Sequence, residues 1–458
     1  MTLPLFDYQQ SAALMMAGQS RFGLHDEMGI GKTATTIGAI NASLATRCMI
    51  VAPAMLRENW IKEFDKFSTY PLRTVKAKTV HDFIAWQRGR FDVLITSYEG
   101  AVKYAKDFRK RGEFIDVIGM DEAHYLKNDE ANRTRAILGR DSSGGFDSIV
   151  GYAEHAYHIT GTPMADNPLD LYTFLKFSNR IDRNFNEFVD RYFSKEVGTF
   201  KVKYSPNPVM LPELKALLAD ARIARTHKDV GLELPPIWLK EVLLEGGAID
   251  LGELEANYPH LEQRIVEAIE TNNIGLLELD YMSTVRRLVG KAKAQPYSKL
   301  LVDELDNGSG KRVVFCAHTE PLLYVHQYLE KHGYKSVVAY GDTTERDRQE
   351  AVRSFMEDPT VKVFIGNIKV AGVGLTLTES SEIDILESDW SPANNAQAIK
   401  RVHRYGQKNE VHARFITLAN SIDVAVNKTV ARKTASIAEI EGFSMTSSVP
   451  LDGSGSPR

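Results

Sequence analysis

Short apolar runs alternate with helix-like segments over two stretches of the chain. Up to about residue 180, the runs that predict strands are Cys48–Ala54, Phe91–Tyr98, Phe114–Met120 and Tyr157–Pro163. The same rhythm returns after residue 298, in Arg312–His318, Ser336–Gly341, Val361–Asn367, Ile383–Trp390 and Ala413–Leu418. Continuous apolar strands separated by helices imply parallel sheets that are covered on both faces. The pattern therefore predicts an α/β fold with two parallel-sheet lobes.

The pattern changes between these stretches. Residues 179–297 are charged and helix-rich, and in Leu211–Ala224 and Leu251–Ile269 the apolar residues recur at helical spacing. Residues 444–458 resemble a flexible linker. We therefore predict a first lobe at 1–178, a helical connector at 179–297, a second lobe at 298–443 and a flexible tail.

Composition narrows the class of protein. The chain has 458 residues, of which 43% are hydrophobic and 25% charged, so it is of ordinary globular composition and larger than one core supports. No apolar run approaches the roughly 20 residues of a membrane span, and no membrane partner is expected. The first residues lack the features of a secretory signal. We expect a cytoplasmic protein of a prokaryotic or viral host cell, or a nuclear one in a eukaryote.

Cysteine count and charge exclude or restrict further classes. The two cysteines, Cys48 and Cys316, lie in apolar runs, which indicates core residues and excludes a disulfide framework. The net charge of −4 restricts nucleic-acid binding to a local basic stripe. Two basic clusters qualify, either as solvated faces or as contacts: Arg286, Arg287, Lys291 and Lys293, and Lys103, Lys106, Arg109, Lys110 and Arg111.

A Gly-rich loop at residues 26–33 lies between a short apolar run and a helix-prone stretch. It contains the residues that a phosphate site needs: Gly29, Gly31, Lys32 and Thr33. The glycines let backbone N–H groups approach a phosphate, the lysine reaches the terminal phosphates, and the threonine can hold Mg²⁺. The loop therefore predicts an ATP site. Since Asp26 stands where the strict motif has its first glycine, the loop alone is also compatible with an ordinary turn before a helix.

Two carboxylates follow the apolar run Phe114–Met120, at the end of a predicted buried strand. Ligands bind at this edge of open α/β sheets. Asp121 suits Mg²⁺, which takes one or two carboxylates together with phosphate oxygens, and Glu122 suits the group that orients and deprotonates the attacking water. Together with the Gly-rich loop, this pair predicts nucleotide hydrolysis.

The segment Gln397–Gln407 places Arg401 and Arg404 three residues apart, which predicts one face of a helix. Two guanidinium groups in the second lobe could neutralise the charge that develops on the γ-phosphate. Ordinary surface ion pairs remain the alternative for this segment alone.

These elements occur in the order found in superfamily-two helicases, and they most resemble the Swi/Snf-type double-stranded DNA translocases. The resemblance rests on Tyr8-Gln9, Ile50–Pro53, Asn59-Trp60, Thr96–Glu99, Thr160–Pro163, Ala371–Thr376, Asp389–Pro392 and the segment up to Gln407. The connector resembles that of the HepA-related annealing helicases through Phe185–Phe188, Arg225–Val230 and Gly290–Lys293. So compact a motor suits a phage or bacterial protein.

The resemblance implies two RecA-like lobes that close on ATP and Mg²⁺, and a motor that tracks duplex, forked or junction DNA 3′ to 5′ on one strand. In such a motor, Gln9 and Gly374 bind the nucleotide. His124, Thr160 and Thr162 couple the state of the bound nucleotide to DNA binding. The residues expected at DNA are Pro53, Thr96, Ser97, Thr376 and Trp390. His124 as a core residue and Trp390 as simple packing remain alternatives.

The expected activity is fork regression, branch migration or strand annealing by a protein that we expect to be monomeric. Three other functions stay open: a strand-separating DNA or RNA helicase, a factor that displaces RNA polymerase or other proteins from nucleic acid, and a nucleotide-gated binding module. Protein partners are not predicted.

Overall fold

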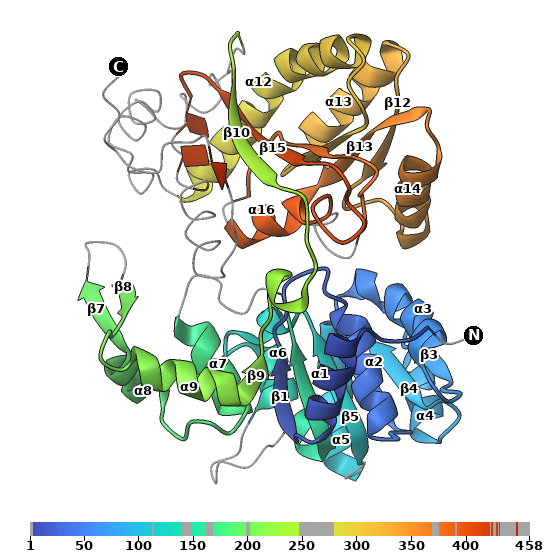
Figure 1. Cartoon of the computed structure of the whole chain (residues 1–458), viewed down its shortest axis with the longest axis vertical. Helices are drawn as coiled ribbons and strands as arrows, with labels where there is room; N and C mark the ends of the chain where they lie inside the picture. The colour runs from blue at the N-terminus through green and yellow to red at the C-terminus, as the bar shows by residue number, and fades with distance from the viewer. Residues whose placement is uncertain are drawn as a thin grey trace. The chain divides into compact units, whose positions relative to one another are not determined.

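The computed structural model describes residues 3–111, 114–139, 148–161, 168–197, 202–246, 279–368, 375–389 and 392–421, with short pieces at 423–424, 427–428, 430 and 446–447. The chain divides into two compact units, Met1–Gly231 and Leu232–Arg458 (Figure 1). Among the described residues, no helix combines the length and the apolar character needed to cross a bilayer.

Unit 1 is built on a seven-stranded parallel sheet of order β3-β4-β2-β5-β6-β1-β9. Its strands are β1 (Arg21–Leu24), β2 (Cys48–Val51), β3 (Thr74–Lys76), β4 (Val93–Thr96), β5 (Ile115–Asp121), β6 (Ala153–Ile159) and β9 (Arg222–Ile223). Each of the four apolar runs predicted in this lobe overlaps one of them. The prediction of a parallel α/β lobe is confirmed.

Helices cover both faces of this sheet (Figure 1). The described helices of unit 1 are α1 (Asp7–Ala17), α2 (Lys32–Ala42), α3 (Arg57–Phe67), α4 (Val80–Gln87), α5 (Tyr98–Arg111), α6 (Asn132–Leu138), α7 (Pro168–Phe177), α8 (Phe185–Tyr192) and α9 (Leu211–Ala221). Short 3₁₀ turns lie at Ala54–Leu56, Ala123–Leu126, Ile149–Tyr152 and Lys228–Val230. A separate antiparallel pair, β7 (Phe193–Val197) and β8 (Val202–Pro206), extends from α8.

Unit 2 repeats the architecture with the strand order β12-β13-β11-β14-β15-β10-β16, again parallel throughout. Its strands are β10 (Ile237–Leu244), β11 (Arg312–Cys316), β12 (Lys335–Ala339), β13 (Val361–Asn367), β14 (Glu382–Ile385), β15 (Val411–Leu418) and β16 (Thr446–Ser447). Its described helices are α12 (Leu279–Asp306), α13 (Thr319–Lys331), α14 (Glu345–Glu357) and α16 (Pro392–Ile399). The second parallel-sheet lobe is therefore also confirmed.

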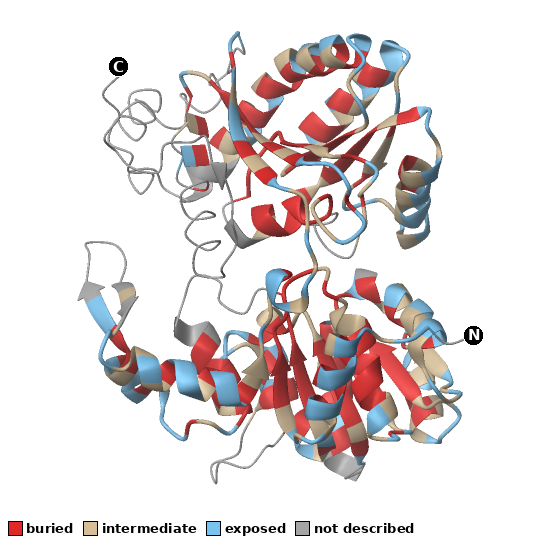
Figure 2. Ribbon diagram, in the orientation of Figure 1, coloured by how far each residue is buried: buried red, intermediate tan, exposed pale blue. Residues whose placement is uncertain are grey.

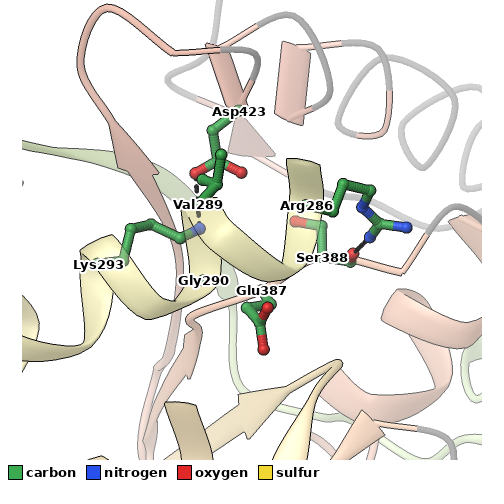
Figure 3. A pocket seen from close by; sticks show the side chains of 7 residues that line it. All are labelled: Arg286, Val289, Gly290, Lys293, Glu387, Ser388 and Asp423. Atoms are coloured by element: carbon green, nitrogen blue, oxygen red, sulfur yellow. Dashed lines mark hydrogen bonds and ion pairs between the residues drawn. The ribbon is translucent and has the colours of Figure 1, made fainter. Parts of the chain in front are cut away.

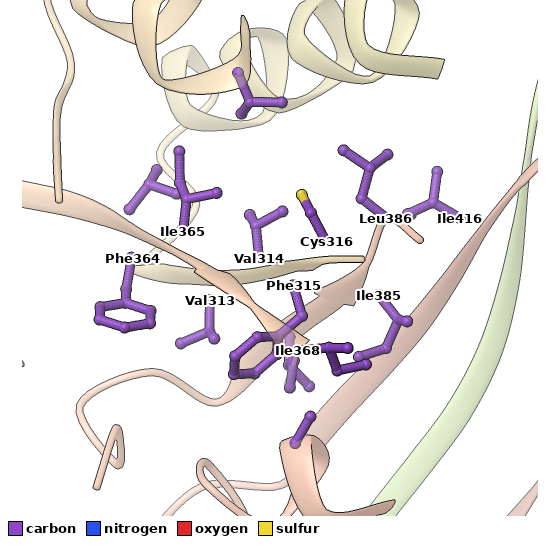
Figure 4. Packing of buried hydrophobic residues seen from close by; sticks show 14 of the residues in the cluster. Val313, Val314, Phe315, Cys316, Phe364, Ile365, Ile368, Ile385, Leu386 and Ile416 are labelled. Atoms are coloured by element: carbon purple, nitrogen blue, oxygen red, sulfur yellow. The ribbon is translucent and has the colours of Figure 1, made fainter. Parts of the chain in front are cut away.

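The core of each unit lies on both faces of its sheet, as the continuous apolar runs predicted (Figure 2). In β11, Val314 and Cys316 point to one face while Val313 and Phe315 point to the other, and all four are fully buried (Figure 4). Cys48 is equally buried, and burial raises the pKa of both thiols. Both cysteines are core residues.

The segment 179–297, predicted as a helical connector, contains strands as well as helices. Besides the β7–β8 pair, it supplies β9 to the first sheet and β10 to the second. In β10, Ile237 and Leu239 are buried on one face, a period-two pattern that charged neighbours obscure in the sequence. The predicted helix at Leu251–Ile269 falls outside the described residues.

Candidate functional site

The Gly-rich loop leads from the carboxyl end of β1 into α2, which begins at Lys32. Gly29 and Gly31 have φ angles of 87° and 92°, a left-handed backbone that favours glycine. A Cβ on Gly31 would also lie 2.3 Å from Nε2 of Gln9. The loop therefore keeps a close backbone approach at the point where a helix N-terminus opens.

Lys32 lies over its own loop. Its Nζ donates hydrogen bonds to the carbonyl oxygens of Asp26 (2.9 Å) and Glu27 (3.1 Å). On the other side, a Cβ on Gly161 would lie 3.0 Å from Lys32 Nζ and 2.7 Å from Met28 Cγ. The segment Thr160-Gly161, predicted to couple nucleotide and DNA, therefore lies directly against the loop. Thr33 is half-buried in the first turn of α2.

Gln9 and its neighbour Tyr8 hold the same loop from α1. Gln9 Nε2 and the Tyr8 hydroxyl both donate to the carbonyl oxygen of Ile30, each at 3.0 Å. The Gln9 Oε1 accepts from the backbone N–H of Phe6 at 3.1 Å. Gln9, predicted to bind the nucleotide, is thus attached to the predicted phosphate loop.

Asp121 is the last residue of β5 and is held on both carboxylate oxygens. Oδ1 accepts from the backbone N–H of Glu122 (3.0 Å), and Oδ2 accepts from Nε1 of Trp60 (2.8 Å). Burial, with the charge of Glu122 adding to it, raises the pKa of Asp121 to about 6, while Trp60 and Lys32 act in the opposite direction. A buried carboxylate of this kind favours a cation beside it.

Glu122 has a left-handed backbone, with φ 50° and ψ 48°, a conformation that non-glycine residues keep mainly where surrounding structure enforces it. His124 Nδ1 lies 3.3 Å from Glu122 Oε2 and 3.5 Å from the Thr160 hydroxyl. The His124 side chain is 30% exposed, so it is not a core residue. A chain of contacts therefore runs from Glu122 through His124 to Thr160.

The residues predicted to contact DNA in unit 1 meet at one edge of the sheet. Val51 of β2 pairs with Thr96 of β4, and Ala52 N–H donates to the Thr96 carbonyl at 3.0 Å, so Pro53 lies beside Thr96 and Ser97. Thr96 is buried, and Ser97 Oγ accepts from the N–H of Gly100 at 3.1 Å. Three predicted site residues lie outside the described residues: Thr162, Gly374 and Trp390.

In unit 2, the prediction that Arg401 and Arg404 share a helical face is wrong. Helix α16 ends at Ile399, and residues 400–406 form turns. Gln407 stabilises these turns, because its Nε2 donates to the carbonyl oxygens of Ser380 (2.7 Å) and Val402 (3.3 Å).

Both arginines adjoin the segment that contains Thr376. Arg404 Nη1 donates to the Leu375 carbonyl at 3.1 Å, and the Arg401 carbonyl accepts from Leu377 N–H at 2.9 Å. Arg401 is buried, with only 7% of the residue exposed. The structure therefore brings these three predicted residues together in unit 2.

A small polar cavity of about 10 Å³ lies at the carboxyl edge of the second sheet (Figure 3). It is lined by Arg286, Val289, Gly290, Lys293, Glu387, Ser388 and Asp423. Lys293 Nζ donates to Asp423 Oδ2 (2.6 Å) and to the Ile416 carbonyl (2.9 Å), and Arg286 donates to the Ser388 carbonyl. The cations of this cavity are thus paired inside the unit.

The remaining members of that basic cluster also have partners. Lys291 Nζ lies 2.7 Å and Arg287 Nη1 3.6 Å from the carboxylate of Glu320. The cluster that the sequence offered as a nucleic-acid contact is therefore engaged within unit 2.

Trp60, Arg225 and His227 lie in segments that resemble the family, but the sequence predicted no role for them. The structure places all three on acidic residues of the site, at Asp121, Asp26 and Glu27 respectively. One signal was available for Arg225, because an aspartate at a glycine position of a phosphate loop needs a cationic partner.

Comparison with known protein families gives two successive matches along the chain. Residues 8–245 match the family model of the SNF2-related domain, and residues 293–406 match that of the helicase conserved C-terminal domain. The DNA annealing helicase and endonuclease ZRANB3 of Bos taurus is 27% identical over 89% of this chain and 38% of its own length.

One further relative and one solved structure cover similar shares of this chain. The Caenorhabditis elegans homolog of SWI/SNF-related matrix-associated actin-dependent regulator of chromatin subfamily A-like protein 1 is 26% identical over 94% of the chain and 61% of that protein. Among solved structures, a Sulfolobus solfataricus SWI2/SNF2 ATPase core in complex with dsDNA matches with a TM-score of 0.44 and 21% identity, covering 96% of this chain and 93% of that one. This chain spans about two fifths of the length of ZRANB3.

Proposed function

The chain belongs to the SNF2-related family, and from this premise we propose that it is an ATP-driven motor that moves along double-stranded or branched DNA. The identification of the sequence as a Swi/Snf-type protein is confirmed by the family match. One observation carries the proposal: Lys32, Asp121 and Glu122 converge at the carboxyl edge of the first sheet, with Thr160-Gly161 packed on the same loop.

The residues present fit a Mg²⁺-bound nucleoside triphosphate. The left-handed Gly29 and Gly31 leave the backbone N–H groups of the loop accessible to phosphate oxygens, and Lys32 can turn from two carbonyls to the terminal phosphates. Thr33 and Asp121 would hold Mg²⁺, which neutralises charge on the phosphates when bound.

Glu122 would orient the attacking water and take its proton, as ATP and water become ADP and inorganic phosphate. Its contact with His124, and that of His124 with Thr160, give a route by which the state of the nucleotide reaches the DNA-facing edge. Arg401 and Arg404 keep the proposed role of neutralising charge on the γ-phosphate.

Pro53, Thr96 and Ser97 would contact DNA phosphates in unit 1, and Thr376 in unit 2, where Gly374 and Trp390 keep their predicted roles. Contacts to the backbone position a protein without reading sequence, and their strength falls steeply with salt. We therefore expect little sequence preference and strong salt dependence. The name of ZRANB3, a DNA annealing helicase and endonuclease, supports strand annealing as the outcome of movement, and fork regression and branch migration stay part of the proposal.

Steady-state ATP hydrolysis by the purified chain tests this proposal. Rates are compared without nucleic acid and with single-stranded DNA, linear duplex, a model fork, a four-way junction and single-stranded RNA, with the Lys32→Ala variant as the inactive control. Stimulation by duplex, and more by fork or junction, is expected. Stimulation by single strands alone, with duplex inert, would instead indicate a strand-separating helicase.

A further inference from the structure

The Gly-rich loop carries two acidic side chains that a triphosphate site would not be expected to tolerate. Asp26 is fully buried and Glu27 is 8% exposed. A buried carboxylate is stable only when cations and hydrogen bonds compensate it. The partners of these two residues therefore decide whether the loop can accept more negative charge.

Arg225 compensates Asp26 with three hydrogen bonds. Its backbone N–H and Nε both donate to Oδ1 at 3.0 Å, and Nη2 donates to Oδ2 at 2.5 Å. The remaining Nη1 donates to the Tyr8 carbonyl at 2.7 Å, and the guanidinium lies 5.3 Å from the centre of the Tyr8 ring. Arg225 thus joins the phosphate loop to α1, the helix that contains Tyr8 and Gln9.

His227 does the same for Glu27. The backbone N–H of His227 donates to Glu27 Oε2 at 3.0 Å, and its Nδ1 lies 2.6 Å from the same oxygen. The backbone N–H of His25 donates to the Ile223 carbonyl and that of Glu27 to the Arg225 carbonyl, both at 2.8 Å. These hydrogen bonds align the start of the Gly-rich loop with the segment that follows β9. We call residues 222–227 the exit segment, because the chain leaves unit 1 at Gly231.

The contacts of the exit segment continue to Lys32. The backbone carbonyls that hold Lys32 Nζ are those of Asp26 and Glu27, whose side chains are held by Arg225 and His227. A shift of the exit segment must therefore move the groups that place the Lys32 ammonium.

We propose that Arg225 and His227 are positioning residues of the nucleotide site, which set the Gly-rich loop and Lys32 for phosphate binding. This rests on the proposed function, in which Lys32 contacts ATP. It goes beyond that function because the exit segment is the part of unit 1 that leads directly into unit 2. Nucleotide binding and the path of the chain between the units are then linked through two ion pairs.

The test measures the affinity of the full chain for a fluorescent ADP analogue, and separately KM for ATP and kcat at saturating ATP. Arg225→Gln is expected to weaken nucleotide affinity and raise KM by at least about tenfold, because it leaves the buried Asp26 carboxylate without its cation. Arg225→Lys should lose less, since an ammonium restores the charge but not the planar fork. His227→Asn, which can still donate to Glu27, should change affinity least.

The double variant Asp26→Asn/Arg225→Gln gives a second measurement, and where Arg225→Gln does not fold, its nucleotide affinity is compared with that of Arg225→Lys and the wild type. Removing both charges is expected to restore part of the affinity that Arg225→Gln loses, which a merely structural role does not predict. The control is Arg191→Gln, which breaks a more exposed arginine–carboxylate pair with Glu213 in the same unit and should leave nucleotide affinity unchanged.

Unchanged nucleotide affinity in Arg225→Gln, with only a lower melting temperature, would overturn the inference. So would a double variant as weak as Arg225→Gln. Failure of the proposed function has a different signature, namely a wild-type chain that binds the ADP analogue but whose ATP hydrolysis no form of DNA stimulates.

Discussion

The two lobes have the same sheet topology but use its carboxyl edge differently. Strand for strand, the order in unit 1 maps onto that in unit 2, with β1 matching β10, β2 matching β11, β5 matching β14 and β6 matching β15. In open parallel sheets, ligands bind beyond the carboxyl ends of the strands. Both lobes therefore offer a site at the same place.

In unit 1 that place holds Lys32 on backbone carbonyls and Asp121 and Glu122 at the end of β5. In unit 2 the acidic residue just after β14 is Glu387. Its Oε2 accepts from the N–H groups of Ala317 (3.1 Å) and His318 (2.9 Å). A Cβ on Gly290 would lie 2.0 Å from Glu387 Oε1, so α12 packs directly on this carboxylate.

Lys293 of unit 2 differs from Lys32 of unit 1 because its partner is a carboxylate. Lys293 is 1% exposed and paired with Asp423. Sheet topology thus decides where a ligand site can lie, whereas the pairing of the side chains there decides whether the site can still bind a ligand. In unit 1 we propose a nucleotide site at this edge, whereas in unit 2 Lys293 and Glu387 are engaged within the unit itself.

The largest expected effect is on kcat, and it distinguishes Glu122 of unit 1 from Glu387 of unit 2. Glu122→Gln should lower DNA-stimulated kcat by about 10³-fold, because general base catalysis contributes on that scale, while nucleotide affinity stays. Glu387→Gln should change kcat far less and act on stability. Steady-state hydrolysis with both variants checks this, and near-wild-type turnover in Glu122→Gln would disprove the assignment of the site.

The next effect concerns stability alone. Lys293→Met should destabilise unit 2 by about 3 to 5 kcal/mol, because it leaves Asp423 without its cation. Lys291→Met is the control on the same helix, since its pair with Glu320 is half-exposed and worth less than about 1 kcal/mol. Urea unfolding of the full chain measures both, and equal shifts would contradict the structural role of the buried pair.

A smaller effect is expected at Trp60. Trp60→Phe keeps the ring but removes the hydrogen bond to Asp121 Oδ2, so the carboxylate is less ready to bind a cation. The Mg²⁺ concentration for half-maximal hydrolysis should rise by about tenfold. Trp86→Phe is the control, because Trp86 is equally buried but donates to the Asp92 carbonyl. An unchanged Mg²⁺ requirement in Trp60→Phe would argue against Asp121 as the metal ligand.

The smallest effect distinguishes the lobes by pH. In unit 1, His25 Nε2 lies 2.9 Å from His158 Nδ1, and burial lowers the pKa of both, that of His158 to about 3. In unit 2, burial opposes but the charges of Arg312 and Arg414 outweigh it, so the pKa of Asp384 is lowered. The buried pair of unit 1 is neutral and the buried network of unit 2 is charged.

Since the folded state keeps each histidine neutral, its contribution is complete above the unfolded pKa of about 6.5 and declines as the pH falls below it. Each histidine should cost unit 1 about 1 kcal/mol between pH 7.5 and 6, whereas the contribution of Asp384 is unchanged in that window. Unfolding midpoints at the two pH values check this. A His158→Met variant with the same pH dependence as the wild type would refute it.

Patterns of apolar residues were sufficient to predict two parallel sheets and most of their strands, because a strand buried on both faces has a continuous run of apolar residues. The Gly-rich loop and the Asp121-Glu122 pair could be located for the same reason, since each follows such a run. The strand β10 was missed because its alternation lies among charged residues. The turns around Arg401 depend on Gln407 and backbone carbonyls of a distant segment, which periodicity does not report.

The pairing of Asp26 with Arg225 lies further beyond sequence analysis. The aspartate indicates that a cation is needed, but about 200 residues separate the two, and any basic residue between them qualifies. Partners of this kind become visible only when the register of β1 and β9 is known.

The position of β1 between β6 and β9 has a consequence for the order in which the protein is made. The strand β1, which leads into the Gly-rich loop, leaves the ribosome before both of its neighbours, and the later of them, β9, follows about 200 residues after it. At roughly 5 to 20 residues per second, that interval is on the order of 10 to 40 seconds. The nascent chain is thus expected to gain affinity for ATP only after residue 227 has emerged, so that the capacity to bind nucleotide marks a finished first lobe.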